Sequence, residues 1–305
     1  MRSVPERVKQ AVHYGGEKNC GQQSWRISMA TILPWRPALR WPGNAARKSS
    51  CLGDYLGELA YPEKTLDLLD QVRKEFPCTF IRGNKEDYWI DRQKGQNPDW
   101  IWEAGSSSTG ILQYVYDRLD DSRIRWFEQM PVAKVMEYPG LPAFVICHGS
   151  PWKVNESMRE DYSYIDELTR KLETELTVCG HFHIQSRYMR NGRTVINPGS
   201  VGIPLRSGGK AQFMMLSGFD GKWEEEFVTL SYDADRAVRE MEEERLPEQA
   251  PGWYRITKQV ILGGTVTHLT VLSRAAGLYR QDTGIQNWRN VPEKYWNLAL
   301  DEFGL

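Results

Sequence analysis

The chain has 305 residues and a formal net charge of −1, and 40% of its residues are hydrophobic. This length allows one large domain or two modest ones, and the near-zero charge excludes a general electrostatic attraction to nucleic acid or to anionic membrane. We expect neither a transmembrane helix, which needs roughly 18 consecutive apolar residues, nor a signal peptide, because the opening "MRSVPERVKQ" has no apolar core.

The first segment, 1–50, is anomalous. Its part 25–50, "WRISMATILPWRPALRWPGNAARKSS", contains three prolines and three tryptophans without a helical or strand period. Proline cannot donate the hydrogen bonds of a central strand. We therefore expect this segment to leave the core without its first central strand.

The pattern from 51 to 232 is regular. Apolar residues at helical spacing predict helices over 61–76, 118–131 and 161–175. Short apolar runs between them predict strands within 78–84, 143–151 and 176–183. Three further strands follow without an intervening helix, within 193–202, 211–219 and 223–232. This order predicts an α/β core that ends in an antiparallel meander.

The remainder, 233–305, is expected to be a helical extension. It contains a charged helical pattern, an apolar one and an amphipathic one, over 233–246, 253–279 and 290–305. Asn290 is the candidate cap of the last helix, with Pro292 in its first turn. We expect the extension to pack on the core or on a second copy of the chain, which makes a homo-oligomer one candidate assembly.

The cysteines favour a reducing compartment. There are five, widely spaced and without a CxxC pair, so neither a zinc knuckle nor a disulfide framework is indicated. Cys51, Cys147 and Cys179 lie in or beside apolar runs, as buried free thiols do. We expect reduced cysteines and a cytoplasmic protein.

Polar residues end four apolar runs, "CLGD", "FIRGN", "VICHGS" and "VCGHFH", and supply Asp54, Asn84, His148, His181 and His183. Loops at the carboxyl ends of strands converge in α/β sheets, so these side chains are expected at one edge. A mixed nitrogen and oxygen set suits Mn²⁺, Fe or Zn²⁺ better than Ca²⁺. Asp54 could bridge two ions, and the H-x-H spacing puts both imidazoles on one side, so that each could serve a different ion.

Each of these residues also has a purely structural interpretation. An Asp or Asn after glycine is typical of a turn, and a histidine that ends a strand is more often a hydrogen-bonded polar residue than a ligand. The five together, each after an apolar strand, favour a metal centre. We assign no role to His268.

The ordered motifs "GD", "RGN", "HGSP", "CGHFH" and "INPGSVGIP" resemble those of the calcineurin-like metallophosphoesterases, in particular the YfcE-like bacterial phosphodiesterases. The resemblance covers about 51–232 and implies a four-layer α/β/β/α sandwich with two divalent ions, Mn²⁺ first, with Fe, Zn or Ni as alternatives. It implies that Asp54 bridges the ions and that Asn84, His148 and His181 complete one site. His183 would belong to the other, and 197–202 would act structurally through glycine φ angles.

Two departures from the family pattern matter. Lys85 stands where the family usually has a histidine that helps the leaving group or positions the phosphate. A lysine can offset phosphate charge but is a weak general acid, and a solvated lysine is the alternative interpretation. The family also begins with a strand that ends in D-x-H-G-N, and no such motif precedes Asp54.

A shift of the reading frame by one base would restore that motif. Codons for 22–31, read from the last base of each, permit T-I-L-A-D-I-H-G-N, and the glycine is forced by the adjacent Met29 and Ala30. We therefore expect that residues up to about Ser50 are translated out of frame. A genuinely divergent N-terminus is the alternative, and the gene sequence would decide, because codons that exclude D-x-H-G would contradict the shift.

These observations predict a metal-dependent phosphoesterase, a phosphodiesterase or phosphatase that uses metal-activated water. The alternative is a catalytically impaired binding or scaffold protein of the same fold without the first metal site, as in a retromer subunit, and a third is the unstable product of a damaged gene. The expected partner is a small-molecule phosphate ester or phosphodiester, and neither nucleic acid nor membrane is indicated. Residues 97–110 are expected to form a lid or cap in which the tryptophans pack.

Overall fold

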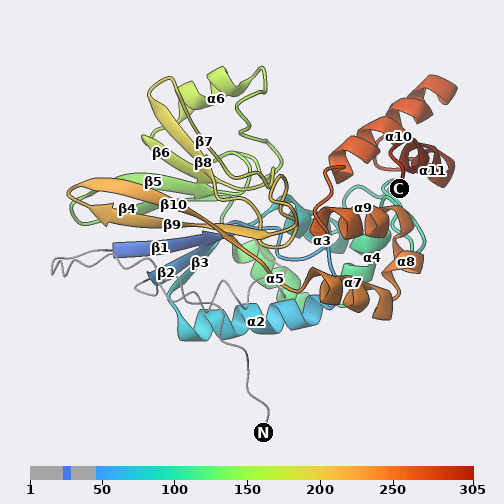
Figure 1. Ribbon diagram of the computed structural model, residues 1–305, viewed down its shortest axis with the longest axis horizontal. Coiled ribbons are helices and arrows are strands. Elements are labelled where there is room, and N and C mark those ends of the chain that lie inside the picture. Colours follow the sequence, from blue (N-terminus) through green and yellow to red (C-terminus); the bar gives the residue numbers. More distant parts are fainter. Residues whose placement is uncertain (1–22, 29–45) are drawn as a thin grey trace, which may run out of the picture.

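The computed structural model describes the backbone of residues 23–28 and 46–305, and the side chains from Ser49 onward. Two five-stranded sheets lie at its centre (Figure 1). The first has the order β10 (Lys222–Leu230), β9 (Ala211–Phe219), β1 (Gln23–Ser28), β2 (Ala46–Cys51) and β3 (Cys78–Phe80). The second has the order β4 (Ala133–Tyr138), β5 (Leu141–Cys147), β6 (Leu176–Cys179), β8 (Arg193–Asn197) and β7 (Ser186–Arg190).

Each sheet is built around three parallel neighbours. These are β1, β2 and β3 in the first sheet and β5, β6 and β8 in the second, and antiparallel strands flank both sets. The two sheets pack face to face through buried apolar side chains, which include Met214 and Leu216 of β9 and Phe144 and Ile146 of β5. Parallel neighbours bring their carboxyl ends to one edge of each sheet, where loops can converge.

Helices cover the outer face of each sheet (Figure 1). Apolar side chains of the first sheet pack with those of α2 (Pro62–Glu75), α3 (Asn84–Gln93), α4 (Gly110–Tyr116) and α5 (Asp121–Gln129). The second sheet packs with α6 (Ile165–Lys171). The expected α/β/β/α sandwich is confirmed. No helix in the described ranges is long and apolar enough to cross a bilayer.

The C-terminal region is helical, as expected, and packs on the core. Its helices are α7 (Ala234–Glu243), α8 (Leu246–Gln249), α9 (Pro251–Ile261), α10 (His268–Thr283) and α11 (Glu293–Glu302). They share one apolar cluster with α3, α4 and α5. The single helical stretch expected over 253–279 is interrupted between α9 and α10, where Gly263 adopts a φ of 99° and is followed by Gly264. Pro292 rather than Asn290 occupies the N-cap position of α11, and the Asn290 side chain instead bonds the backbone of Asp99 and Ile101.

The expectation that the N-terminal segment supplies no central strand is wrong. β1 lies between β2, to which it is parallel, and β9, to which it is antiparallel. Backbone hydrogen bonding on both sides holds a strand there, and Pro34, Pro37 and Pro42 all lie beyond its last residue, Ser28. The rest of the anomalous segment, 1–22 and 29–45, lies outside the described residues.

Three smaller expectations can also be compared. The expected meander is only partly correct, because β8 joins the second sheet beside β6, and of the three strands expected to form the meander only β9 and β10 pair with each other. An unpredicted strand, β7, lies between β6 and β8 in the chain and pairs with β8, so the chain stays in the second sheet and returns to the first at β9. The four cysteines of the described residues are free thiols. Trp100 and Trp102 are buried in the apolar cluster, so the packing expected for 97–110 is confirmed.

Candidate metal centre

Four of the predicted ligands come together where the chain leaves the carboxyl ends of four strands. Asp54, Asn84, His148 and His181 follow β2, β3, β5 and β6 in that order. The Oδ1 atom of Asn84 lies 3.0 Å from Nε2 of His148 and 2.9 Å from Nδ1 of His181. Nε2 of His148 lies 3.4 Å from Oδ2 of Asp54 and 3.3 Å from Nδ1 of His181. The structure thus brings these four side chains around one point.

The hydrogen bonding of His148 leaves room for a cation at that point. Its Nδ1 donates to the carbonyl of Leu52 at 2.5 Å, so in the neutral ring Nε2 presents a lone pair. This lone pair faces the amide oxygen of Asn84 and the carboxylate of Asp54, which are acceptors too. Three acceptors this close repel one another unless a proton or a cation lies among them. A transition metal with mixed nitrogen and oxygen ligands fits this set, and the Leu52 carbonyl orients the imidazole as outer ligand partners do.

Burial and neighbouring charges shift the pKa in opposite directions at Asp54 and His148 and in the same direction at His181. Burial raises the pKa of Asp54, but His148 and Lys85 outweigh it and hold that pKa below its usual value. Burial lowers the pKa of His148, but the Asp54 carboxylate raises it above the ordinary value. Burial and the neighbouring His148 lower the pKa of His181 to about 3, so this ring is neutral at pH 7 and can act as a ligand.

His183, the fifth predicted ligand, lies outside this group of four. Its Nδ1 donates to the carbonyl of Ile203 at 2.9 Å, which leaves Nε2 with a lone pair. Burial lowers the pKa of His183, so its ring is also neutral at pH 7. A position beside the group but not within it suits the predicted assignment to a second ion, which stays a prediction.

The loops that carry Asp54 and Asn84 are packed backbone against backbone. A Cβ on Gly83 would lie 2.3 Å from Oδ1 of Asp54 and 2.5 Å from its backbone nitrogen. A Cβ on Gly53 would lie 2.4 Å from the nitrogen of Gly83, and Gly53 has a φ of 87°. Only glycine fits both positions, which is the physical reason for the "GD" and "GN" pairs.

Glu86 is a positioning residue that the sequence analysis missed. Its fully buried carboxylate accepts hydrogen bonds from the backbone nitrogens of Asp54 and Gly83, each at 2.8 Å, and of Tyr55 at 3.0 Å. Burial and the nearby Asp54 raise the pKa of Glu86 to about 7. The available signal was a glutamate three residues after the helix N-cap Gly83, the spacing of a capping box.

Lys85 is not a solvated lysine. Its side chain is buried, and Nζ forms an ion pair with Glu58 and donates to the carbonyl of Gly57 at 2.7 Å. The other carboxylate oxygen of Glu58 accepts from Nε1 of Trp253 in α9 at 2.7 Å. The His268 ring of α10 stacks on Trp253 with centroids 4.1 Å apart. Glu58 therefore joins the C-terminal helices to the metal edge.

Backbone strain is concentrated at the predicted ligands. Asp54, His181 and His183 have φ values of 54°, 72° and 58°, three of the nine positive φ values among the non-glycine residues of the described chain. A strained backbone conformation of this kind persists only where surrounding contacts hold it in place, and such positions cluster at functional sites. Asn197 provides part of that support, because it donates to the carbonyl of Gly180 at 2.5 Å and accepts from the nitrogen of Gly199 at 2.8 Å.

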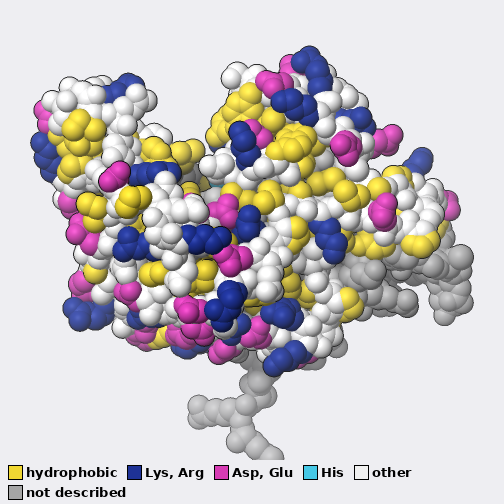
Figure 2. Space-filling view, turned by 180° about the vertical axis from the view of Figure 1, so that it is seen from behind, with side chains coloured by type: hydrophobic (Ala, Val, Ile, Leu, Met, Phe, Trp, Pro, Cys, Tyr) yellow, Lys and Arg dark blue, Asp and Glu magenta, His cyan; other side chains and the backbone are white. Residues whose placement is uncertain are grey.

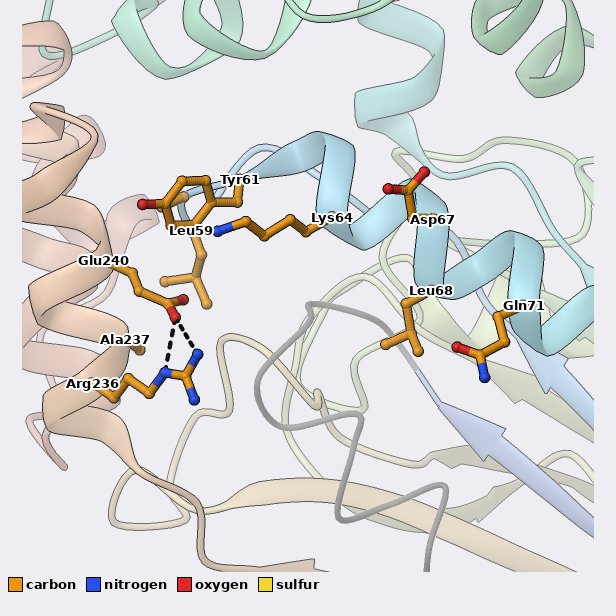
Figure 3. A pocket seen from close by; sticks show the side chains of 10 residues that line it. Leu59, Tyr61, Lys64, Asp67, Leu68, Gln71, Arg236, Ala237 and Glu240 are labelled. Atoms are coloured by element: carbon orange, nitrogen blue, oxygen red, sulfur yellow. Dashed lines mark hydrogen bonds and ion pairs between the residues drawn. The ribbon is translucent and has the colours of Figure 1, made fainter.

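The metal edge opens into a cavity of about 630 Å³. Asp54, Asn84, His181 and His183 line one side of it, and residues of α9, α10 and their connection line another. Figure 2 shows the hollow between the lobe formed by α10 and α11 and the lobe that carries α6. A separate cavity of about 270 Å³ lies between α2 and α7, beside Lys64 and the Arg236–Glu240 pair (Figure 3). None of the predicted ligands lines that second cavity.

β1 leads toward the same edge, because its last residue, Ser28, pairs with Cys51 at the end of the parallel strand β2. In the shifted frame the missing Asp would fall at about 26, and its His and Gly would fall at about 28–30. Residues 29–45 lie outside the described residues, so the frame hypothesis stays a prediction.

Comparison with known proteins gives a family match over most of the core. The model of the calcineurin-like phosphoesterase superfamily domain matches residues 45–219. An uncharacterized protein of Methanocaldococcus jannaschii is 24% identical over 219 residues, which cover 66% of this chain and 83% of that protein. The family match begins after β1, so it leaves out the segment to which the frame hypothesis applies.

Two solved structures share the fold. A hypothetical protein of Pyrococcus horikoshii aligns with a TM-score of 0.62 at 20% identity and covers 79% of this chain and 100% of that one. A metallophosphoesterase of Sphaerobacter thermophilus aligns with a TM-score of 0.62 at 19% identity and covers 80% of this chain and 100% of that one. Both alignments extend beyond the family match into the helical C-terminal region or the N-terminal segment, because each covers more of the chain than 45–219.

Proposed function

The chain belongs to the calcineurin-like phosphoesterase superfamily, and we propose that it is a metal-dependent hydrolase of small-molecule phosphate monoesters or diesters. One observation carries the proposal. The donor atoms of Asp54, His148 and His181 lie within 4.8 Å of one another, with the Asn84 oxygen between the two histidines. This arrangement has the chemistry of a metal site and lies in the wall of the 630 Å³ cavity.

The proposed roles follow the sequence analysis. Asp54, Asn84, His148 and His181 would hold one ion, and His183 would hold the second with Asp54 as the bridge. Divalent ions bound there supply positive charge to the phosphoryl oxygens and lower the pKa of water toward 7. Mn²⁺ is the proposed metal, with Fe, Zn or Ni as alternatives, and the proposed location is the cytoplasm. The proposed catalytic core is 51–232, and 233–305 is its extension.

A second candidate function is a binding protein of the same fold that does not turn over substrate. The environment of Lys85 favours it, because the ammonium group is held by Glu58 and Gly57 rather than directed at the four converging side chains. Under this proposal Lys85 has no catalytic role, and phosphate binding would persist without hydrolysis.

The deciding experiment is metal stoichiometry by elemental analysis of the full chain loaded with Mn²⁺, together with hydrolysis of bis(4-nitrophenyl) phosphate. Two ions and turnover are expected. One ion without turnover would show that the N-terminal segment supplies no ligands and would favour the binding protein. Asn84→Leu should abolish binding of the ion at the group of four, whereas Asn155→Leu, at an exposed asparagine, should leave it unchanged. Binding of no ion by the wild-type chain would refute the proposed hydrolase.

A further inference from the structure

The cavity at the metal edge has a wall that the four converging side chains do not provide. The connection of α9 to α10 and the first turns of α10 contribute Thr267, Leu269, Thr270 and Leu272. The loops that follow β6 and β8 contribute Phe182 and Leu205. The wall therefore combines large apolar side chains from the C-terminal region with others from the core.

The apolar side chains in this wall are exposed to the cavity rather than buried behind it. Leu269, in the first turn of α10, lines the cavity and is 58% exposed. Leu272 and Leu205 are partly buried at the edge of the apolar cluster, and Phe182 is partly buried against the second sheet. A concave apolar surface of this size next to a polar centre is the usual form of a small-molecule site.

The wall is held in a fixed position over the metal edge. Trp253 donates to Glu58, and Glu58 also binds Lys85 beside Asn84. His268 stacks on Trp253, and its Nε2 lies 2.9 Å from the hydroxyl oxygen of Thr257. These contacts connect the start of α10 to the loop that carries Asp54. Preformed walls of this kind bind a ligand without an additional ordering cost.

Two arginines, Arg159 and Arg206, also line the cavity. Arg159 is paired with Asp161, at 2.9 Å and 2.5 Å. Arg206 is exposed and, within the described residues, has no carboxylate at ion-pair distance. A ligand in this cavity would therefore meet both positive charge and apolar surface.

We propose that this cavity selects phosphate esters that carry a large apolar group, aromatic or alkyl, and that Leu269 and Leu272 bind that group. This inference rests on the proposed function for the position of the phosphoryl group. The cavity volume of about 630 Å³ admits an ester group much larger than methyl. Small polar esters such as glycerol phosphates would leave the leucine wall in contact with water and are poor ligands.

Equilibrium binding tests this without turnover. The probes are methylphosphonate, phenylphosphonate and octylphosphonate, titrated by calorimetry into the full chain loaded with Mn²⁺. We expect at least one of the two larger probes to bind at least tenfold more tightly than methylphosphonate, about 1.4 kcal/mol. A preference for phenyl over octyl would identify an aromatic ester group as the natural ligand, and the reverse would identify an alkyl one.

The matched variants are Leu269→Asp and Leu298→Asp. Leu298, on α11, is 52% exposed and does not line the cavity, so both substitutions replace an exposed helical leucine with the same charge. Leu269→Asp should reduce the preference to less than threefold, and Leu298→Asp should retain it. The proposal is overturned if the three probes bind within twofold of one another, if none binds, or if Leu269→Asp keeps the full preference.

Hydrolysis is measured separately, with methyl 4-nitrophenyl phosphate and phenyl 4-nitrophenyl phosphate, which share one leaving group. Retained binding preference with no hydrolysis of either ester would refute the proposed function for diesters and support the cavity assignment. Hydrolysis of both esters with equal kcat/KM, together with equal binding of the probes, would support the function and refute the cavity assignment.

Discussion

The two sheets contribute to the candidate metal centre in different ways. The first edge, formed by the loops after β2 and β3, carries Asp54 and Asn84 and is held by buried charge and close backbone packing. The second edge, formed by the loops after β5 and β6, carries three histidines, two of which are oriented by single hydrogen bonds to the carbonyls of Leu52 and Ile203. Substitutions at the first edge should therefore lower folding stability, whereas substitutions at the second edge should mainly lower metal affinity.

The largest expected effect is that of Lys85→Met at the first edge. Burial raises the pKa of Glu58, but Lys85 lowers it below its usual value, so Glu58 is charged at pH 7. Removal of the lysine leaves this carboxylate buried and unpaired, which should lower the free energy of unfolding by about 3–5 kcal/mol. Urea denaturation measures this free energy. The double variant Lys85→Met/Glu58→Gln should recover most of the lost stability.

The control is Lys171→Met on α6, where the ion pair with Glu167 is exposed and screened by solvent, so the change in stability should be far smaller than for Lys85→Met. If Lys85→Met instead leaves stability unchanged and abolishes hydrolysis, Lys85 acts on the phosphate and the contrast between the edges fails at this residue.

Gly83→Ala should be the next most damaging change. The added Cβ would meet the Asp54 side chain and backbone at 2.3–2.5 Å, and the backbone cannot yield as a flexible side chain does. We expect a loss of about 3 kcal/mol in the free energy of unfolding. Gly277→Ala in α10, where an added Cβ meets nothing within 4 Å, should be neutral or stabilise the helix by up to about 1 kcal/mol. Equal effects of the two substitutions in thermal denaturation would contradict the close packing.

At the second edge, His181→Ala and His183→Ala should separate the two proposed ions. Loss of His181 removes a ligand from the group of four and should weaken binding there by more than about 100-fold. Loss of His183 should leave that ion bound and remove the other. Mn²⁺ titration followed by electron paramagnetic resonance counts the ions that each variant binds. Unfolding in EDTA should show that both histidine variants lose less stability than Gly83→Ala. Identical loss of both ions in both variants would contradict the assignment.

The sequence predicts those ligands, helices and strands that depend on the local pattern of residues. The five candidate ligands follow apolar runs and glycines, and four of them converge because parallel strands bring such positions to one edge. The helices α2, α5 and α6 and most strands were likewise visible as periodic apolar runs. Residues close together in the sequence are enough to specify these features, so the resemblance and the periodicity identified them.

The sequence does not show what depends on distant partners. Glu58, Lys85 and Trp253 are far apart in the chain, and only the fold shows that they share one buried contact. β1 was missed although Trp25 and Ile27 alternate with polar residues, because this short alternation runs into the irregular proline-rich stretch and only the fold shows its main-chain pairing with β2 and β9. The break between α9 and α10 at Gly263 was hidden inside an apolar stretch, although its two glycines were the available signal.

The smallest expected effect concerns the contact that joins the C-terminal helices to the first edge. Burial lowers the pKa of His268 to about 4, whereas an unfolded histidine titrates near 6.5. As the pH falls below 6.5, the unfolded chain takes up a proton at this position that the folded chain does not. The stability contributed by neutral His268 is therefore complete above pH 6.5 and is lost progressively as the pH falls toward 4.

His268→Gln removes this titration and keeps a group that can hydrogen-bond Thr257. Between pH 7 and pH 5, the wild-type chain should lose about 1–2 kcal/mol more stability than the variant. Urea unfolding in EDTA at both pH values measures the difference, and in the comparison with wild type the contributions of His181 and His183 cancel because both are present in each protein. An equal pH dependence would show that His268 is accessible to protons in the folded state. The C-terminal helices would then be attached to the first edge more loosely than the buried contacts of Glu58 imply.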